Sequence, residues 1–205
     1  MKERMKHIKN IIFDVGEVLL SYRWKDMLLD HGLSLERAEQ VGEIMFEDQL
    51  WKKLDMGEYL VEEVIAAYET KYPAYGADIR WFITHGEQMH VPREKIWKQL
   101  GQLKEKGYNI YLLSNYSEQL FQKHTKGADF LQVIDGKVVS YEVHKIKPDP
   151  GIYQCLLDRY HLKPEECLFF DDRRENVEAG RRMGISGIQV KSEEQLYAIL
   201  AEIIE

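Results

Sequence analysis

Near the start of the chain stands the segment Ile11-Ile12-Phe13-Asp14-Val15-Gly16, in which an apolar run is followed by a carboxylate and then by a glycine. A short continuous apolar run is typical of a strand that is covered on both faces, as in a parallel sheet. Asp14 then lies at the carboxyl end of that strand, the edge at which open α/β sheets bind their ligands. The segment therefore predicts the first strand and a candidate site residue directly after it.

Four further apolar runs follow along the chain, and helical patterns separate them. The runs cover residues 108–113, 138–140, 167–170 and 188–190, and the helical patterns cover 92–106, 117–126, 150–160 and 175–183. Asp149 as N-cap with Pro150 at the first helical position marks the start of the third helix, because a proline there loses no intrahelical hydrogen bond. Strands that alternate with helices predict an α/β fold with a doubly wound parallel sheet.

The alternation is interrupted once, between residues 22 and 91. No convincing strand pattern occurs there, whereas apolar residues recur at helical spacing between Gly32, Gly57 and Pro73. We expect an all-helical insertion over residues 22–91 and a core formed by residues 1–21 and 92–205. Because the insertion follows the first strand, it would lie over the carboxyl edge of the sheet as a lid that excludes water. A plain helical extension packed against the core is the alternative.

The composition is that of an ordinary globular protein. The chain has 205 residues, of which 44% are hydrophobic and 31% charged, with a formal net charge of −7 and no basic tract, which argues against nucleic-acid binding. No segment reaches the roughly 20 apolar residues of a membrane span. No secretory signal pattern precedes the first strand, so the expected location is the cytoplasm. Cys155 and Cys167 are expected to be reduced thiols without a chemical role.

Groups suited to nucleophilic chemistry follow the first two predicted strands. Asp14 stands on a rigid support, as a nucleophilic carboxylate requires, although an aspartate in such a place often only caps a turn. Gly16 lets the backbone turn and offer its carbonyl to a ligand or metal ion. Ser114 and Asn115 supply a hydroxyl and backbone N–H groups, which hold a phosphate oxygen as fixed dipoles do. Helix capping by Ser114 or Ser117 is the alternative.

A cation follows the third predicted strand. Lys147 stands in Lys147-Pro148-Asp149-Pro150, where two prolines restrict the chain and direct the lysine side chain. An ammonium group there would balance charge between a nucleophilic carboxylate and a phosphoryl oxygen. Lys145 is a nearby competitor for the same role. A solvated position on the surface, where most lysines lie, is the alternative for either residue.

Two adjacent carboxylates end the fourth predicted strand. Asp171 and Asp172 would repel each other unless a cation or several donors satisfied them. Mg²⁺ suits such a pair, because it prefers hard oxygen ligands and binds one or two carboxylates together with waters and substrate phosphate. Asn176 falls one turn into the next helix, where it can orient the pair. A surface network with Arg173 and Arg174 is the alternative.

Taken together, the motifs at residues 13–18, 114–115, 147–150 and 171–176 resemble those of the haloacid dehalogenase-like hydrolase superfamily. The resemblance covers nearly the whole chain and implies a Rossmann-like core with a helical cap of the first type. Within the superfamily the sequence is most similar to small bacterial phosphatases of sugar phosphates, a group related to the phosphatase domain of soluble epoxide hydrolases. The resemblance therefore implies a magnesium-dependent phosphatase that forms an aspartyl-phosphate intermediate on a small phosphate ester.

The resemblance also implies a role for each matching residue. Asp14 would be the nucleophile and Lys147 the charge stabiliser. Ser114 and the Asn115 amide would bind phosphate. The magnesium ligands would be Asp14, the Gly16 carbonyl and Asp172, with Asp171 and Asn176 in support.

The sequence departs from the superfamily at one position. The common first motif of its phosphatases is Asp-x-Asp-Gly-Thr, whose second aspartate protonates the leaving group, but Gly16 stands there in this chain. The departure leaves two alternatives open: a phosphate-binding protein of weak or no activity, and a metal-independent hydrolytic dehalogenase. For an active phosphatase it predicts a preference for esters whose alcohol departs easily, such as anomeric sugar phosphates.

Substrate selection is expected to come from the insertion. Trp24, Trp51, Tyr59 and His90 are the aromatic or polar residues there that could face a sugar, although aromatic residues in small helical caps more often serve packing. The expected partner is a small-molecule phosphate ester, without nucleic acid or membrane. The expected assembly is a monomer or a weak homodimer.

Overall fold

The centre of the molecule is a parallel sheet of five strands in the order β5-β4-β1-β6-β7. The computed structural model describes residues 7–205, and residues 1–6 lie outside the described part. The strands are β1 (Asn10–Phe13), β4 (Asn109–Ser114), β5 (Gly136–Val139), β6 (Cys167–Asp171) and β7 (Ser186–Gln189). The prediction of an α/β fold with a doubly wound parallel sheet is confirmed.

β1 lies in the middle of the sheet, and all of its residues are buried. It pairs with β4 on one side and β6 on the other, so that Phe13 lies opposite both Leu112 and Phe170. The Phe13 and Phe170 rings stack with centroids 5.3 Å apart. Successive side chains of a strand point to opposite faces, so Ile11 and Phe13 join one core layer and Ile12 joins the other.

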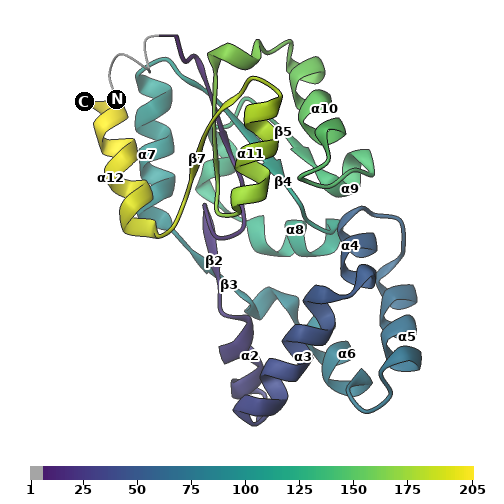
Figure 1. The fold of residues 1–205 in the computed structure, drawn as a ribbon. Helices are drawn as coiled ribbons and strands as arrows, with labels where there is room; N and C mark the ends of the chain where they lie inside the picture. The colour runs from purple at the N-terminus through teal and green to yellow at the C-terminus, as the bar shows by residue number, and fades with distance from the viewer. Residues whose placement is uncertain (1–6) are drawn as a thin grey trace.

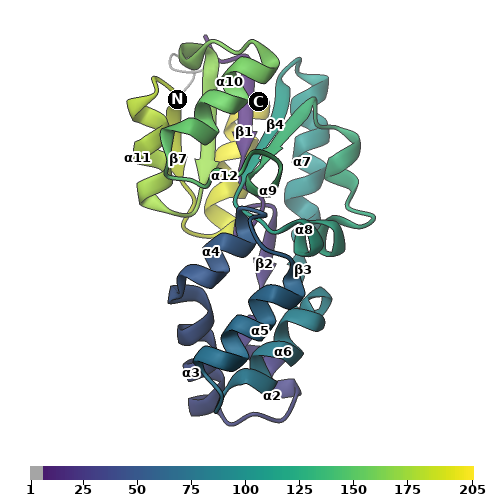
Figure 2. The same ribbon diagram turned by 90° about the vertical axis from the view of Figure 1, so that its right-hand side faces the viewer.

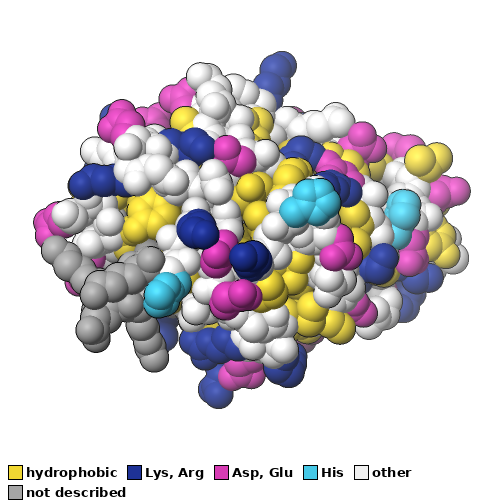
Figure 3. Space-filling model, turned by 90° about the horizontal axis from the view of Figure 1, so that it is seen from above, with side chains coloured by type: hydrophobic (Ala, Val, Ile, Leu, Met, Phe, Trp, Pro, Cys, Tyr) yellow, Lys and Arg dark blue, Asp and Glu magenta, His cyan; other side chains and the backbone are white. Residues whose placement is uncertain are grey.

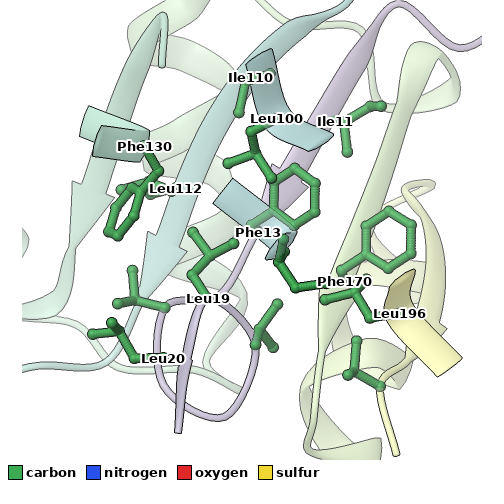
Figure 4. Close-up of a cluster of buried hydrophobic side chains, with 14 of the residues drawn as sticks. Ile11, Phe13, Leu19, Leu20, Leu100, Ile110, Leu112, Phe130, Phe170 and Leu196 are labelled. Atoms are coloured by element: carbon green, nitrogen blue, oxygen red, sulfur yellow. The ribbon is translucent and has the colours of Figure 1, made fainter. Parts of the chain in front are cut away.

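Helices cover both faces of the sheet (Figure 1). One face carries α7 (Glu94–Glu105) and α12 (Glu193–Ile204), and the other carries α10 (Pro150–Tyr160) and α11 (Arg174–Arg182). Figure 4 shows Leu100 of α7 and Leu196 of α12 near Phe13 and Phe170. Short elements complete this part, namely α8 (Glu118–Thr125), η2 (Asp129–Gln132), α9 (Ser140–Val143) and η3 (Pro164–Glu166). The double cover buries the strands, as their apolar runs require.

A second group of helices lies beyond the carboxyl ends of the strands (Figure 2). We call it the cap; it consists of α2 (Trp24–Asp30), α3 (Leu35–Glu47), α4 (Gln49–Asp55), α5 (Val61–Lys71), α6 (Gly76–Thr84) and η1 (Gly86–Gln88). The cap has its own hydrophobic core, which includes Met45, Tyr68 and Phe82. It therefore packs as a unit beside the sheet rather than as part of the helical layers.

Two short strands join the cap to the sheet. β2 (Leu20–Tyr22) and β3 (His90–Pro92) pair in antiparallel fashion, with Tyr22 opposite His90. The expectation that no strand occurs between residues 22 and 91 is therefore wrong at both ends of that region. Strands of three residues are too short for apolar alternation to show, and Val91 at the centre of β3 is 41% exposed.

Smaller differences concern the ends of predicted elements. The run at 138–140 is a strand only as far as Val139, because Ser140 begins α9. The last strand ends at Gln189, one residue earlier than expected. The helix expected from residue 117 begins at Glu118, with Ser117 as its N-cap. Shifts of this size are usual, because helix and strand ends fray.

The outer surface carries charges of both signs. On the face shown in Figure 3, basic and acidic side chains are interspersed rather than separated. Within residues 7–205, no helix combines the length and the apolar character that crossing a bilayer demands.

Candidate active site

Asp14 follows β1 directly and lines a cavity at the carboxyl end of the sheet. Its Oδ1 accepts hydrogen bonds from Ser114 Oγ at 2.6 Å and from the Val15 N–H at 2.7 Å. Its Oδ2 lies 2.8 Å from Lys147 Nζ. Because each carboxylate oxygen has a donor, the side chain is held in one orientation, with only 7% of the residue exposed.

Lys147 is a buried cation between two carboxylates. Its Nζ donates to a backbone carbonyl of β4 at 2.8 Å and to Asp171 Oδ2 at 2.6 Å, besides pairing with Asp14. Asn115 holds the main chain at this point, since its Oδ1 accepts from the Lys147 N–H at 2.7 Å and its Nδ2 donates to the Lys147 carbonyl at 2.9 Å. The competitor Lys145 is exposed. The cation of this site is therefore Lys147.

The two adjacent aspartates face different partners. Asp171 is fully buried and accepts hydrogen bonds from Lys147, from the Arg173 N–H at 2.8 Å and from Asn176 Nδ2 at 3.0 Å. Asp172 lines the cavity, together with Asp14 and Asn176. The alternative of a surface network with two arginines is wrong, because the Arg173 and Arg174 side chains pair with Glu175 and Glu178 instead.

The residues present fit a divalent cation. Carboxylate oxygens of Asp14, Asp171 and Asp172 lie within 4.8 Å of one another. Only one ammonium group, that of Lys147, pairs with this cluster among the described residues, so three formal negative charges face a single positive one. Asn176 Oδ1 is buried without a hydrogen-bond partner, because its amide nitrogen is the atom that faces Asp171. Hard oxygen ligands around an excess negative charge are what Mg²⁺ prefers.

The pKa values reflect the same excess of negative charge. Burial raises the pKa of Asp14 to about 7, and although Lys147 lowers it, Asp171 and Asp172 raise it further. Burial likewise raises the pKa of Asp172 to about 6, with a contribution from Asp171. A cation held between the two carboxylates would favour their charged forms and lower both pKa values.

The cavity lies between the sheet and the cap and measures about 490 Å³, a volume suited to a small molecule. Both parts of the molecule line it. The sheet side contributes the predicted residues Asp14, Gly16, Asn115, Lys147, Asp172 and Asn176, and the cap side contributes Trp24, Phe46, Trp51, Lys52 and Asp55. Ser114 and Asp171 lie just behind this lining, where they contact Asp14 and Lys147. The predicted site residues are thus brought together at one place.

The candidate substrate-facing residues of the cap divide into two pairs. Trp24 and Trp51 line the cavity. Tyr59 is 40% exposed and lies beneath the Lys53 ammonium, and His90 packs against the ring of His124 at 4.7 Å. Tyr59 and His90 are not among the residues that line the cavity.

Several residues that line the cavity were not singled out from the sequence, and two of them, Tyr22 and Asp55, carry polar groups beside the predicted site residues. Tyr22 Oη lies 2.6 Å from Tyr116 Oη, which lies 2.9 Å from His124 Nδ1. The Tyr22 ring stands where a side chain of residue 16 would be, with ring carbons 2.9 Å from the position of an added Cβ. Asp55 ends α4 at the entrance to the turn that contains Gly57. The only sequence signal for Asp55 was its position two residues before Gly57, a glycine typical of a turn.

The comparisons with known proteins agree with this geometry. The haloacid dehalogenase-like hydrolase family matches residues 8–184. The D-ribitol-5-phosphate phosphatase of Bacteroides thetaiotaomicron is 27% identical over 89% of this chain and 91% of its own length.

Two solved structures show the same fold. A HAD family enzyme from Bacteroides thetaiotaomicron, solved in complex with magnesium and inorganic phosphate, matches with a TM-score of 0.71 and 22% identity over 91% of this chain and 96% of that one. The L-2-haloacid dehalogenase of Xanthobacter autotrophicus matches with a TM-score of 0.67 and 19% identity over 95% and 83% of the two chains. Since the family match spans most of the sequence, the chain belongs to the haloacid dehalogenase-like hydrolases.

Proposed function

We propose that this hydrolase is a magnesium-dependent phosphatase that cleaves a small phosphate monoester through an aspartyl-phosphate on Asp14. The observation that carries the proposal is the buried Asp14 carboxylate at the cavity, 2.8 Å from Lys147 Nζ and within 4.8 Å of the Asp171 and Asp172 oxygens. A phosphate ester is dianionic, so it needs the cations that such a cluster holds. A carbon–halogen substrate needs no magnesium ion.

Asp14 acts as the nucleophile in this proposal. The Ser114 hydroxyl and the Val15 N–H both donate to Asp14 Oδ1. These two bonds fix the orientation of the carboxylate and therefore the direction from which it attacks phosphorus. The Lys147 ammonium group balances the negative charges of the Asp14 carboxylate and the phosphoryl oxygens as they approach each other. Asp171 keeps the lysine in place through its hydrogen bond. The Asn115 side chain holds the main chain of Lys147, and the Asn115 amide would bind the phosphate. The Ser114 hydroxyl would exchange its bond to Asp14 for one to a phosphoryl oxygen.

Asp14, the Gly16 carbonyl and Asp172 would hold the magnesium ion, with Asp171 and Asn176 in support. When bound, the ion supplies positive charge that stabilises the phosphoryl oxygens during transfer. Support for the ion comes from the unpartnered Asn176 Oδ1 and from the net negative charge of the cluster. The related enzyme that was solved with magnesium and inorganic phosphate adds to that support.

A sugar phosphate or sugar-alcohol phosphate is the proposed substrate class. The cavity of about 490 Å³ combines charged groups on the sheet side with Trp24 and Trp51 on the cap side, which suits a polar carbon chain that carries a phosphate. The name of the related D-ribitol-5-phosphate phosphatase agrees with this class. We propose that residues 22–91 act as the cap domain of a cytoplasmic monomer or weak homodimer.

Phosphate release from a panel of sugar phosphates, nucleotides and phospho-acids, with Mg²⁺ and with a chelator, tests the proposal. Wild type should release phosphate only with the metal, and Asp14→Asn should release none above background. Equal release by wild type and Asp14→Asn would mean that Asp14 does not catalyse hydrolysis. It would favour the alternative of a protein that only binds phosphate. Activity on a 2-haloacid that persists with the chelator would favour the dehalogenase instead, a reaction for which the fold has a precedent.

A further inference from the structure

Given the proposed function, one step has no residue assigned to it, because the departing alcohol needs a proton. Residue 16 is a glycine and has no side chain to supply one. Proton donation of this kind is typically worth about 10²- to 10⁴-fold in rate. A carboxyl group elsewhere at the cavity could supply that proton instead.

Tyr22 fills the space beside Gly16 but is poorly placed to donate. His124 Nε2 lies 2.7 Å from the Gly86 carbonyl, which only accepts, so this nitrogen carries the proton. Burial lowers the pKa of His124 to about 4, which leaves Nδ1 as an acceptor at neutral pH. Tyr116 then donates to Nδ1 and Tyr22 donates to Tyr116. The Tyr22 oxygen therefore presents lone pairs, not a proton, to the cavity.

The direction of attack places the leaving oxygen on the cap side. In phosphoryl transfer the attacking and leaving oxygens lie roughly in line through phosphorus. Asp14 attacks from the end of β1, on the sheet side of the cavity, so the leaving oxygen points away from the sheet. A carboxyl group that the cap contributes to the cavity is therefore placed to reach the leaving oxygen.

Four carboxylates line the cavity among the described residues: Asp14, Glu17, Asp55 and Asp172. Asp14 is the proposed nucleophile and Asp172 a proposed metal ligand. Glu17 is engaged elsewhere, since Oε1 accepts from the Tyr22 N–H at 2.9 Å and Oε2 lies 3.3 Å from Arg93. Asp55 is the one that the cap supplies, and within residues 7–205 its side chain forms no ion pair.

Contacts with α9 and the residue after it, on the sheet side of the cavity, hold Asp55 in place. Ser140 Oγ, at the start of α9, lies 2.5 Å from the Asp55 carbonyl oxygen. His144 Nδ1 lies 2.8 Å from the carbonyl of Met56, the next residue. The turn is completed by Gly57 at φ +65°, where an added Cβ would lie 3.0 Å from the Tyr141 carbonyl. The main chain around Asp55 is thus docked on α9 and the residue after it, and this docking positions its side chain at the cavity.

The surroundings keep Asp55 able to carry a proton. Burial raises the pKa of Asp55 to about 7, the Ser117 N–H lowers it in part, and the Asp14 charge raises it further. A carboxyl group with a pKa close to the working pH serves well both as acid and as base.

We propose that Asp55, from the cap, is the proton donor to the leaving oxygen and replaces the carboxylate that the chain lacks at Gly16. As Asp14 attacks phosphorus, the ester P–O bond breaks, and the leaving oxygen keeps the electron pair and takes the Asp55 proton. In the second step the Asp55 carboxylate takes a proton from water while the water oxygen attacks phosphorus. The bond from phosphorus to Asp14 then breaks, which releases phosphate and restores both carboxyl groups.

Two esters of similar shape test the proposal: p-nitrophenyl phosphate, whose anion departs without a proton, and benzyl phosphate, whose alkoxide needs one. The measured quantity is kcat/KM, which reports steps up to departure of the alcohol. Wild type should hydrolyse both esters. Asp55→Asn should lower kcat/KM for benzyl phosphate by about 10²- to 10⁴-fold and for p-nitrophenyl phosphate by less than about tenfold. Retained activity on the aryl ester also shows that the variant is folded.

Glu58→Gln is the matched control, because Glu58 is an exposed carboxylate of the same turn and does not line the cavity. It should leave both rates unchanged. Equal losses on the two esters in Asp55→Asn, no loss on either, or a wild type inactive on benzyl phosphate would each overturn the role of Asp55. A wild type no better than Asp14→Asn on either ester would instead overturn the proposed phosphatase function.

Discussion

The Tyr22 ring occupies the space beside Gly16, so close that a Cβ at residue 16 would lie 2.9 Å from two of the ring carbons. The glycine and the tyrosine therefore depend on each other: only a residue without a side chain leaves room for this ring. The same contact explains why the common second aspartate could not be accommodated here without moving Tyr22, and with it the hydrogen bonds to Tyr116 and His124.

Gly16→Ala should lower the free energy of unfolding by about 1–3 kcal/mol, the usual cost of inserting a methyl group into occupied space. In a Tyr22→Ala background the same substitution should cost close to nothing, because the obstructing ring is gone. Urea unfolding of the four proteins measures this coupling. An equal cost in both backgrounds would show that the two residues do not compete for space.

Replacing Lys147 with Met should lower phosphate release by at least about 10²-fold, because the charge that faces Asp14 is lost. The free energy of unfolding should fall by about 3–5 kcal/mol, since Asp171 would remain buried without its cation. Lys145→Met is the control: this lysine is exposed two residues away and should tolerate the change. Similar losses in the two variants would argue against the assignment of Lys147.

Mg²⁺ should stabilise the protein more at pH 8 than at pH 5.5. Asp14 and Asp172, with pKa values raised to about 7 and about 6, hold protons at pH 5.5 that the metal must displace. Without metal, the folded state binds more protons than the unfolded state between about pH 4 and 7, so the free energy of unfolding falls as pH rises through that window.

Thermal unfolding with and without Mg²⁺ checks this at the two pH values. At a hundredfold excess over its dissociation constant, a ligand adds about 2.7 kcal/mol, equivalent to about 5–10 °C in Tm for a chain of this size. Asp172→Asn should lose most of the shift at pH 8, since it removes a proposed ligand. A shift independent of pH, or one that survives in Asp172→Asn, would contradict this metal site.

His124 should make the protein sensitive to acid. Its pKa is lowered by burial to about 4 in the folded state, so the unfolded state binds more protons between about pH 6.5 and 4. The contribution of His124 to the free energy of unfolding is fully present above the pKa of the unfolded state. It is lost as the pH falls toward the pKa of the folded state, by up to about 3 kcal/mol. Urea unfolding of wild type and His124→Gln from pH 7 to 4.5 should show a flatter profile for the variant. Parallel profiles would mean that His124 does not titrate with unfolding.

The order of the elements was predictable because it depends on local patterns. Continuous apolar runs such as 11–13 and 167–170 predict buried strands, and the polar residue that ends each run lies at the edge where ligands bind. Asp14, Ser114 and Asp171 could be assigned to that edge for this reason. The short strands β2 and β3 could not be predicted, because three residues are too few to show a periodic pattern.

Other features of the site depend on contacts between residues far apart in the chain. The sequence could not show that Asp171 pairs with Lys147 while Asp172 faces the cavity, since adjacent carboxylates differ only in the direction of their side chains. Nor could it show that Tyr22 meets Gly16 and Tyr116, or that Asp55 is docked on Ser140 across 85 residues.

The sequence by itself determined the five strands of the central sheet, the helices between them and the polar residues at the strand ends, because periodicity and the residue types at the termini act within a few positions. The tertiary structure alone decided which groups share the cavity and which partner each one takes. Those choices follow from how the cap packs against the sheet, and that packing depends on complementary surfaces that no local pattern encodes.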